Sequence, residues 1–211
     1  MIFYNKSITA FLLLLTCFMP IYYNLFLLRL YSSLVCVISY FEFNNQILSK
    51  NIIGKQFHIF IYYWLLFPIV IINFLIPLKD CWNVIMITVF SDGIQQISNK
   101  LFVQIYHKDN YFKKIMLSNP FYSLSPNKTV VGYLGGMTTL LLSNFFEYQI
   151  SFILSIYIFG CVGDLFASYF KRLIEINDYS HFLGSHGGFL DRFDAIIFNI
   201  HLIYVFSLFS L

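Results

Sequence analysis

Residues 57–78 read FHIFIYYWLLFPIVIINFLIPL, and no Asp, Glu, Lys or Arg interrupts them. A helix needs about 20 consecutive apolar residues to cross the hydrocarbon core of a bilayer, and this stretch is long enough. The whole 211-residue chain has the same character, because 59% of its residues are hydrophobic and only 11% are charged. Soluble domains carry about 25% charged residues. We therefore expect an all-α, polytopic integral-membrane helical bundle.

The same length rule predicts about seven membrane spans along the chain. They cover residues 8–28, 30–43, 57–78, 81–99, 130–146, 150–170 and 193–211. The second is short, and we expect it to pair with the first as a compressed or re-entrant hairpin. The fifth and sixth should form a tight helical hairpin. No repeat or linker divides the chain, so we predict a single membrane domain over residues 1–211.

The positions of the basic residues predict the orientation of the chain, because cytoplasmic loops are enriched in Lys and Arg. If the N-terminus is cytoplasmic and all seven spans cross, only Arg29 and Lys79 of the thirteen basic residues face the opposite side. The two polar loops, residues 100–128 and 171–192, then share the cytoplasmic face. We expect a multi-pass membrane protein whose active site lies on that face.

Charged residues gather in residues 163–194, which read GDLFASYFKRLIEINDYSHFLGSHGGFLDRFD. Asp164 falls inside an otherwise apolar span, where a charge is costly and indicates function. The spacing of Asp164, Ser168, Lys171 and Arg172 places all four on one face of a helix. We expect this face to contribute to a site.

Asp191 and Asp194 are three residues apart and should face the same way from the first turn of the last helix. The preceding pair, Gly187 and Gly188, allows backbone to approach a ligand closely. Carboxylates that converge near a membrane surface suit Mg²⁺, and neighbouring basic side chains suit phosphate oxygens. Alternatively, these charges line a solvated loop or pair with one another.

Residues 168–194 resemble the signature of the phosphatidate cytidylyltransferases, also called CDP-diacylglycerol synthases. The family pattern contains S-x-x-K-R and ends in H-G-G-x-x-D-R-x-D. This chain matches it at Ser168, Lys171, Arg172, Asp178, Ser180, Leu183, Gly184, His186, Gly187, Gly188, Asp191, Arg192 and Asp194. It departs at Asn177, where the family has a lysine.

A second block, residues 125–132, resembles the family's S-P-K-K-T-x-E-G. Ser125, Pro126, Lys128, Thr129 and Gly132 match, while Asn127 and Val131 depart. Further upstream, Asp92 and Gly93 form a weaker match, and the resemblance covers roughly residues 80–200. Gly132 and Gly136 also form a G-x-x-x-G, which we interpret as a helix-packing motif rather than a phosphate contact.

The resemblance implies a reaction of CTP with phosphatidic acid that gives CDP-diacylglycerol and pyrophosphate, with Mg²⁺ as cofactor. It divides the chain into N-terminal membrane helices, residues 1–78, and a catalytic core, residues 79–211. It also implies membrane lipids as partners and a homodimer, and we expect no nucleic-acid partner.

The same resemblance implies roles for individual residues of the candidate site. Asp164, Asp191 and Asp194 are implied as metal ligands, and Lys128, Lys171, Arg172 and Arg192 as phosphate clamps. Ser125, Thr129 and Ser168 are implied as hydrogen-bond donors, and Asp178, Gly187 and Gly188 as further substrate contacts. His186 is expected to position a phosphate or to orient an aspartate, with general-base catalysis as the alternative.

Two other functions stay open. One is a related CTP-dependent enzyme that acts on another lipid phosphate. The other is a catalytically weak membrane scaffold derived from the family. Asn177 and Val131, which replace a basic and an acidic residue of the family pattern, keep the second alternative open.

Overall fold

The computed structural model describes residues 25–50, 55–105, 111–126, 128–142, 148–184 and 187–209. Helices joined by turns make up this part of the chain, and it contains no strand, so the all-α prediction is confirmed. The helices are α2 (Leu25–Lys50), α3 (Lys55–Val70), the π-helical turn η1 (Ile71–Leu75), α4 (Leu78–Ile105), α5 (Tyr111–Met116), α6 (Val130–Met137), the 3₁₀ turn η2 (Thr138–Leu142), α8 (Ile150–Leu173) and α9 (Leu190–Phe209).

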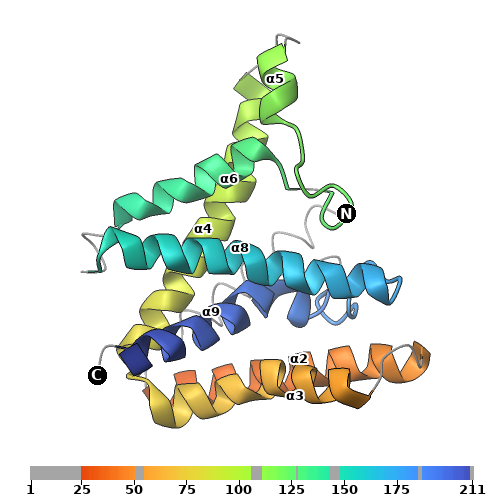
Figure 1. Ribbon diagram of the computed structural model, residues 1–211, viewed down its shortest axis with the longest axis vertical. Coiled ribbons are helices and arrows are strands. Elements are labelled where there is room, and N and C mark those ends of the chain that lie inside the picture. Colours follow the sequence, from red (N-terminus) through yellow and green to blue (C-terminus); the bar gives the residue numbers. More distant parts are fainter. Residues whose placement is uncertain are drawn as a thin grey trace.

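Helix α4 crosses most of the other helices and packs against α6, α8 and α9 (Figure 1). Helices α8 and α9 pack along one another in the middle of the view. Helices α2 and α3 form an adjacent pair at the foot of the view, and both contact α9. The N-terminal end of α9 and the C-terminal end of α8 therefore lie near the end of the bundle where α2 finishes.

Glycines allow the close approach between helices of this core. A Cβ atom on Gly136 of α6 would lie 2.7 Å from Gln95 of α4 and 2.7 Å from the Tyr157 ring of α8. A Cβ atom on Gly132 would lie 3.3 Å from the Gln95 carbonyl oxygen. These contacts confirm the packing interpretation of the G-x-x-x-G motif.

The region around residues 25–50 differs from the prediction. Residues 30–43 do not form a short segment of a hairpin, because they lie inside the single helix α2. The expected break at Arg29 is absent: Arg29 is exposed near the start of α2. A long basic side chain near a helix end can keep its charge outside the apolar layer without interrupting the helix. Most of the first predicted span, residues 8–24, lies outside the described residues.

The other predicted spans coincide with helices whose ends differ. Residues 57–78 become α3 and η1, which contain Pro68 and end before α4 begins at Leu78. Proline lacks an N–H and disturbs regular helical hydrogen bonding, which accounts for irregularity after it. The span expected at 130–146 is the short α6 followed by η2, and residues 143–147 lie outside the described residues. Helix α6 packs mainly on α4 and contacts α8 less.

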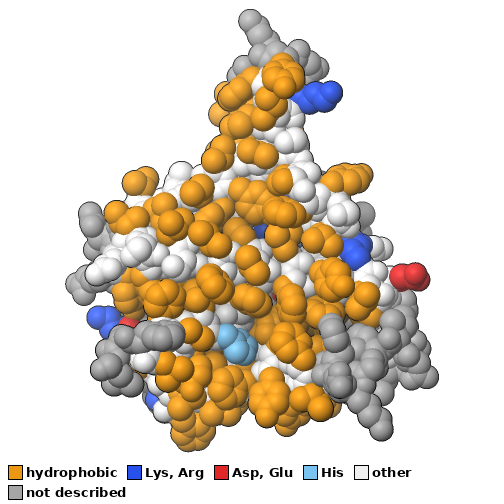
Figure 2. Space-filling model, viewed as in Figure 1, with side chains coloured by type: hydrophobic (Ala, Val, Ile, Leu, Met, Phe, Trp, Pro, Cys, Tyr) orange, Lys and Arg blue, Asp and Glu red, His pale blue; other side chains and the backbone are white. Residues whose placement is uncertain are grey.

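Large apolar side chains cover much of the surface, with few charged side chains among them on the face in Figure 2. Among the described helices, two are long and apolar enough to cross a membrane, namely Phe26–Ile47 within α2 and α8 itself. Ile59–Leu75 and Val130–Leu141 are shorter apolar helices. The exposed apolar surface and these apolar helices indicate a membrane protein.

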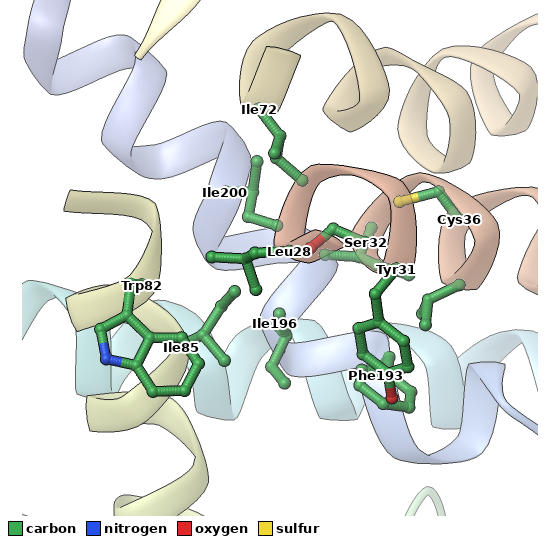
Figure 3. Close-up of a pocket in the computed structure, with 12 residues that line it drawn as sticks. Leu28, Tyr31, Ser32, Cys36, Ile72, Trp82, Ile85, Phe193, Ile196 and Ile200 are labelled. Carbon is green, nitrogen blue, oxygen red and sulfur yellow. The ribbon is translucent and has the colours of Figure 1, made fainter. Parts of the chain in front are cut away.

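An apolar pocket lies where α2, α4 and α9 meet. The side chains that line it include Leu28, Trp82 and Ile196 (Figure 3). Tyr31 of α2 meets Phe193 of α9 edge to face, with ring centroids 6.4 Å apart. Helix α2 is therefore held firmly against the first turns of α9.

Candidate active site

Two ion pairs start from one face of α8, at residues two helical turns apart. Asp164 pairs with Lys128, which precedes α6, and Lys171 pairs with Asp191, which lies in the first turn of α9. Ser168 lies between them on α8 and is buried. The predicted shared face of α8 therefore connects two separate parts of the chain.

Lys128 is held by groups from two helices. Its Nζ atom forms the ion pair with Asp164 of α8 and donates a hydrogen bond of 3.3 Å to Oε1 of Gln95 on α4. Burial alone would lower the pKa of Lys128, but the nearby carboxylates of Asp164 and Asp92 outweigh it and raise the pKa. Lys128 is therefore a fixed positive charge within the bundle.

Asp191 is surrounded by donors. Its Oδ1 atom accepts from Nζ of Lys171 at 2.9 Å, and its Oδ2 atom accepts from the backbone N–H groups of Tyr179 and Gly188, both at 2.9 Å. The side chains of Lys171 and Asp191 are only 13% and 3% exposed. Asp191 thus ties the end of α8, the loop after it and the start of α9 together.

Three aspartates from three helices interact electrostatically with one another: Asp92 of α4, Asp164 of α8 and Asp194 of α9. Asp194 is 5% exposed, and its Oδ1 atom accepts from the backbone N–H of Ala195. Neither Asp92 nor Asp194 forms an ion pair with a described residue. Neighbouring carboxylates without an ion-pair partner are costly when charged, so either an added cation or a bound proton would stabilise this cluster.

The donor chemistry of the cluster fits Mg²⁺, which prefers carboxylate oxygens. Within the described ranges, however, no three His, Cys, Asp or Glu side chains lie close enough together to hold one ion. The predicted ligand Asp191 also uses both oxygens on Lys171 and the backbone. The carboxylates would have to move closer together to share a single cation.

Arg172 points away from this cluster. Its Nε atom donates to the Leu124 carbonyl oxygen at 3.2 Å, and its Nη1 atom lies 3.4 Å from Oδ1 of Asn177. Asn177, the residue that departs from the family pattern, therefore accepts a hydrogen bond from a predicted phosphate clamp. Ser125 follows Leu124 in the same turn and holds Asn119 through its carbonyl oxygen. Arg172, Asn177 and the turn that contains Leu124 and Ser125 therefore form an outer edge of the candidate site.

Thr129 caps the N-terminus of α6, where its Oγ1 atom accepts from the backbone N–H of Gly132 at 3.2 Å. Its hydroxyl proton stays available to donate, as the predicted phosphate contact requires. Asp178 is exposed beside Gly187, and Arg192 is exposed on α9 and interacts electrostatically with Asp92. His186 lies outside the described residues.

Glu42 of α2 is a site-adjacent residue that the sequence analysis missed. Its Oε1 atom accepts from the Ser180 hydroxyl at 2.6 Å and from the Phe189 N–H at 3.0 Å, while Oε2 accepts from the Leu190 N–H at 2.9 Å. A Cβ atom on Gly188 would lie 2.5 Å from Glu42 Oε2. Gly188 therefore leaves room for a carboxylate of the chain itself, and its predicted contact with the substrate stays a prediction.

Glu42, Asp92 and Gln95 could have been found by the rule that selected Asp164, since each is a polar residue within an apolar stretch. Asp92 appeared only as part of the weaker upstream match, and Gln95 links Lys128, Asp92 and Cys161 through its amide. The structure therefore adds α2 and α4 to a site that the motifs placed around α8 and α9.

Comparison with known proteins gives consistent matches. The cytidylyltransferase family matches residues 111–210. The phosphatidate cytidylyltransferase of Aquifex aeolicus is 35% identical over 147 residues, which cover 67% of this chain and 54% of that protein. The Bacillus subtilis phosphatidate cytidylyltransferase is 37% identical over 99 residues, which cover 41% of this chain and 37% of that protein.

The chain thus spans about half the length of the Aquifex relative. A phosphatidate cytidylyltransferase of Staphylococcus aureus is similar over a shorter region, with 36% identity over 91 residues that cover 38% of this chain and 35% of that protein. The family match includes both motif blocks and the residues that form the two ion pairs. The resemblance is confirmed, and residues 111–210 match the cytidylyltransferase family.

Proposed function

We propose that the protein is a phosphatidate cytidylyltransferase that transfers CMP from CTP to phosphatidic acid. The observation that carries the proposal is the pair of lysine–aspartate contacts, Lys128–Asp164 and Lys171–Asp191, on one face of α8 beside the buried Asp194. A site for two polyanionic substrates needs cations that are already positioned, and these contacts position two of them.

In this reaction an oxygen of the lipid phosphate attacks the α-phosphorus of CTP. The bond from that phosphorus to the oxygen bridging to the β-phosphate breaks, and pyrophosphate leaves with the bonding electrons. The lipid phosphate is already an anion, so little proton transfer is needed. The work of the protein is to bring anions together and to stabilise the charge on the leaving group.

Lys128 and Lys171 are the residues that the proposal assigns to the phosphates, with Arg172 and Arg192 at the exposed rim. The raised pKa of Lys128 supports its part, since the side chain stays charged at physiological pH. Thr129, Ser125 and Ser168 are the proposed hydroxyl donors. Gly187 and Gly188 remain proposed substrate contacts through their backbone, and Asp178 through its exposed carboxylate.

Mg²⁺ is proposed as the cofactor, with Asp164 and Asp194 as ligands and Asp191 as a third. A bound divalent cation would neutralise phosphate oxygens and the departing pyrophosphate. Asp92 belongs to the same electrostatic cluster and is a further proposed ligand. Asp92 and Asp194 form no ion pair within the described part of the chain, which supports this part of the proposal.

A multi-pass arrangement with the site at the cytoplasmic end belongs to the same proposal. Gln46, near the end of α2, donates to the Tyr179 carbonyl oxygen at 2.8 Å, so the end of α2 lies beside the loop after α8. Arg29 interacts electrostatically with Cys81 at the start of α4, at the other end of α2. Most basic residues of the chain are expected on the side opposite Arg29 and Lys79. This supports a cytoplasmic location for the end of the bundle that carries the site.

The test uses purified protein in detergent with Mg²⁺, labelled CTP and a panel of lipid phosphates. CDP-diacylglycerol formed from phosphatidic acid, with CTP preferred over other nucleoside triphosphates, is the expected result. Product from an ether-linked lipid phosphate but not from phosphatidic acid would replace the proposed substrate. Folded protein that yields no product with any lipid phosphate would favour the inactive scaffold.

A further inference from the structure

Residues 188–190 connect the glycine pair to α9, and their backbone N–H groups are all held by carboxylates. The Gly188 N–H donates to Asp191 Oδ2, the Phe189 N–H to Glu42 Oε1 and the Leu190 N–H to Glu42 Oε2, over 2.9–3.0 Å. The first N–H groups of a helix have no partner within the helix and carry partial positive charge. A carboxylate is therefore the matching group at this position.

Glu42 reaches this position from a distant part of the chain. It lies in α2, is 9% exposed, and precedes Leu190 by 148 residues. Its third contact, at 2.6 Å, is the hydroxyl of Ser180 in the loop after α8. Glu42 lies outside residues 111–210, which match the cytidylyltransferase family. One side chain of α2 thus fixes both the loop and the helix that carry the proposed site.

We propose that Glu42 is a positioning residue for this site, acting through the first turn of α9 on Asp191 and Asp194. This inference rests on the proposed function, because the chemistry that it supports is the transfer of CMP. Asp191 and Asp194 project from the turn whose N–H groups Glu42 holds. Loss of the Glu42 carboxylate frees that turn, and the two aspartates lose their fixed position relative to Lys171 and Asp164.

A purely structural role makes a different prediction. Such a role would lower the melting temperature and leave the turnover of folded protein unchanged. A positioning role lowers kcat by about 10–100-fold, the usual cost of losing a group that orients reacting residues. Because Glu42 is almost fully buried and contacts the loop after α8 and the start of α9, KM for phosphatidic acid should change by much less than kcat.

The experiment compares wild type with Glu42→Gln, which keeps the size of the side chain and removes the charge. Ser39→Ala is the matched control, because Ser39 is fully buried in the same helix and its hydroxyl has no hydrogen-bond partner in the described part of the structure. kcat, KM and melting temperature are measured for each. Hydrogen–deuterium exchange of peptides that cover residues 187–194 is measured without substrates.

Glu42→Gln is expected to lose kcat by about 10–100-fold and to exchange faster at residues 188–190, with Ser39→Ala like wild type. If Glu42→Gln does not fold, Glu42→Asp keeps the charge with a shorter reach and should show the same direction of change. Unchanged kcat in folded Glu42→Gln would overturn the inference, whether or not the exchange changes. Wild type without activity would refute the proposed function instead, and the exchange data would still decide whether Glu42 anchors α9.

Discussion

Gly188→Ala offers a quantitative test of how α2 holds the start of α9. The added Cβ atom would lie 2.5 Å from Oε2 of Glu42 and 2.8 Å from its Cδ and Oε1 atoms, closer than real Cβ contacts come. Glu42 would have to withdraw and release the N–H groups of Phe189 and Leu190. Hydrogen bonds to a charged group contribute about 1.5–3 kcal/mol each, so roughly 3–6 kcal/mol are at stake.

Alanine also restricts the unfolded chain, which returns up to about 1 kcal/mol. The expected loss in the free energy of unfolding is therefore roughly 2–5 kcal/mol. For a chain of this length that corresponds to a fall in melting temperature of roughly 4–20 °C. Circular dichroism of the purified protein in detergent during heating measures it.

Gly93→Ala is the matched control, because a Cβ atom on Gly93 of α4 would meet nothing within 4 Å. Alanine is a better helix former than glycine by about 1 kcal/mol, so this variant should be as stable as wild type or slightly more stable. The reasoning is refuted if Gly188→Ala melts like Gly93→Ala. It is also refuted if Gly188→Ala destabilises a Glu42→Ala background as strongly as it destabilises wild type.

Two further predictions concern the ion pairs of α8. Lys171→Met leaves the Asp191 carboxylate buried without its cation. A double-mutant cycle with Asp191→Asn should therefore give a coupling free energy of about 1–3 kcal/mol in unfolding experiments. Additive effects of the two substitutions would contradict the ion pair. The pKa of Lys128 is raised above its unfolded value by Asp164 and Asp92 despite burial, so its stabilising contribution is complete below about pH 10 and is lost only as pH rises through the higher folded value. The difference in melting temperature between wild type and Lys128→Gln should then stay constant from about pH 7 to pH 10, and a difference that shrinks within that range would show that the pKa is not raised.

The local parts of the site could be predicted from the sequence. Asp164 stands out in an apolar stretch, and its spacing to Lys171 places both on one face of α8. Asp191 was expected in the first turn of the last helix and lies there. These predictions succeed because they depend on residues within one or two helical turns of each other.

Contacts between distant segments could not be predicted in the same way. The sequence does not reveal that Lys128 pairs with Asp164, or that Asp92 of α4 joins Asp164 and Asp194. Such contacts depend on how helices cross, which side-chain spacing does not specify. The hydrogen bonds of Glu42 span up to 148 residues and join α2, where the family resemblance is absent, to the signature loop.

The glycine pair shows what the fold adds to a recognised motif. Gly187 and Gly188 were expected to let backbone approach a ligand. In the structure the space beside them is filled by carboxylates of the chain, from Asp191 next to Gly187 and from Glu42 next to Gly188. The need for a small residue was predicted correctly, because a close approach does occur there. The groups that approach the two glycines, the carboxylates of Asp191 and Glu42, could only be identified from the fold.

The most direct test of the central claim measures formation of CDP-diacylglycerol from labelled CTP and phosphatidic acid, with Mg²⁺ and with EDTA, in wild type, Asp194→Asn and Asp80→Asn. Asp194 is preferred to Asp191 because Asp191 holds the loop after α8 through Tyr179 and Gly188, whereas Asp194 accepts only from the adjacent Ala195 N–H among the described residues. Asp80 is a control that pairs with Tyr148 away from the cluster. We expect Mg²⁺-dependent product in wild type and Asp80→Asn, and a loss of at least about 100-fold in folded Asp194→Asn. Equal activity in Asp194→Asn, or no product from folded wild type, would contradict the central claim.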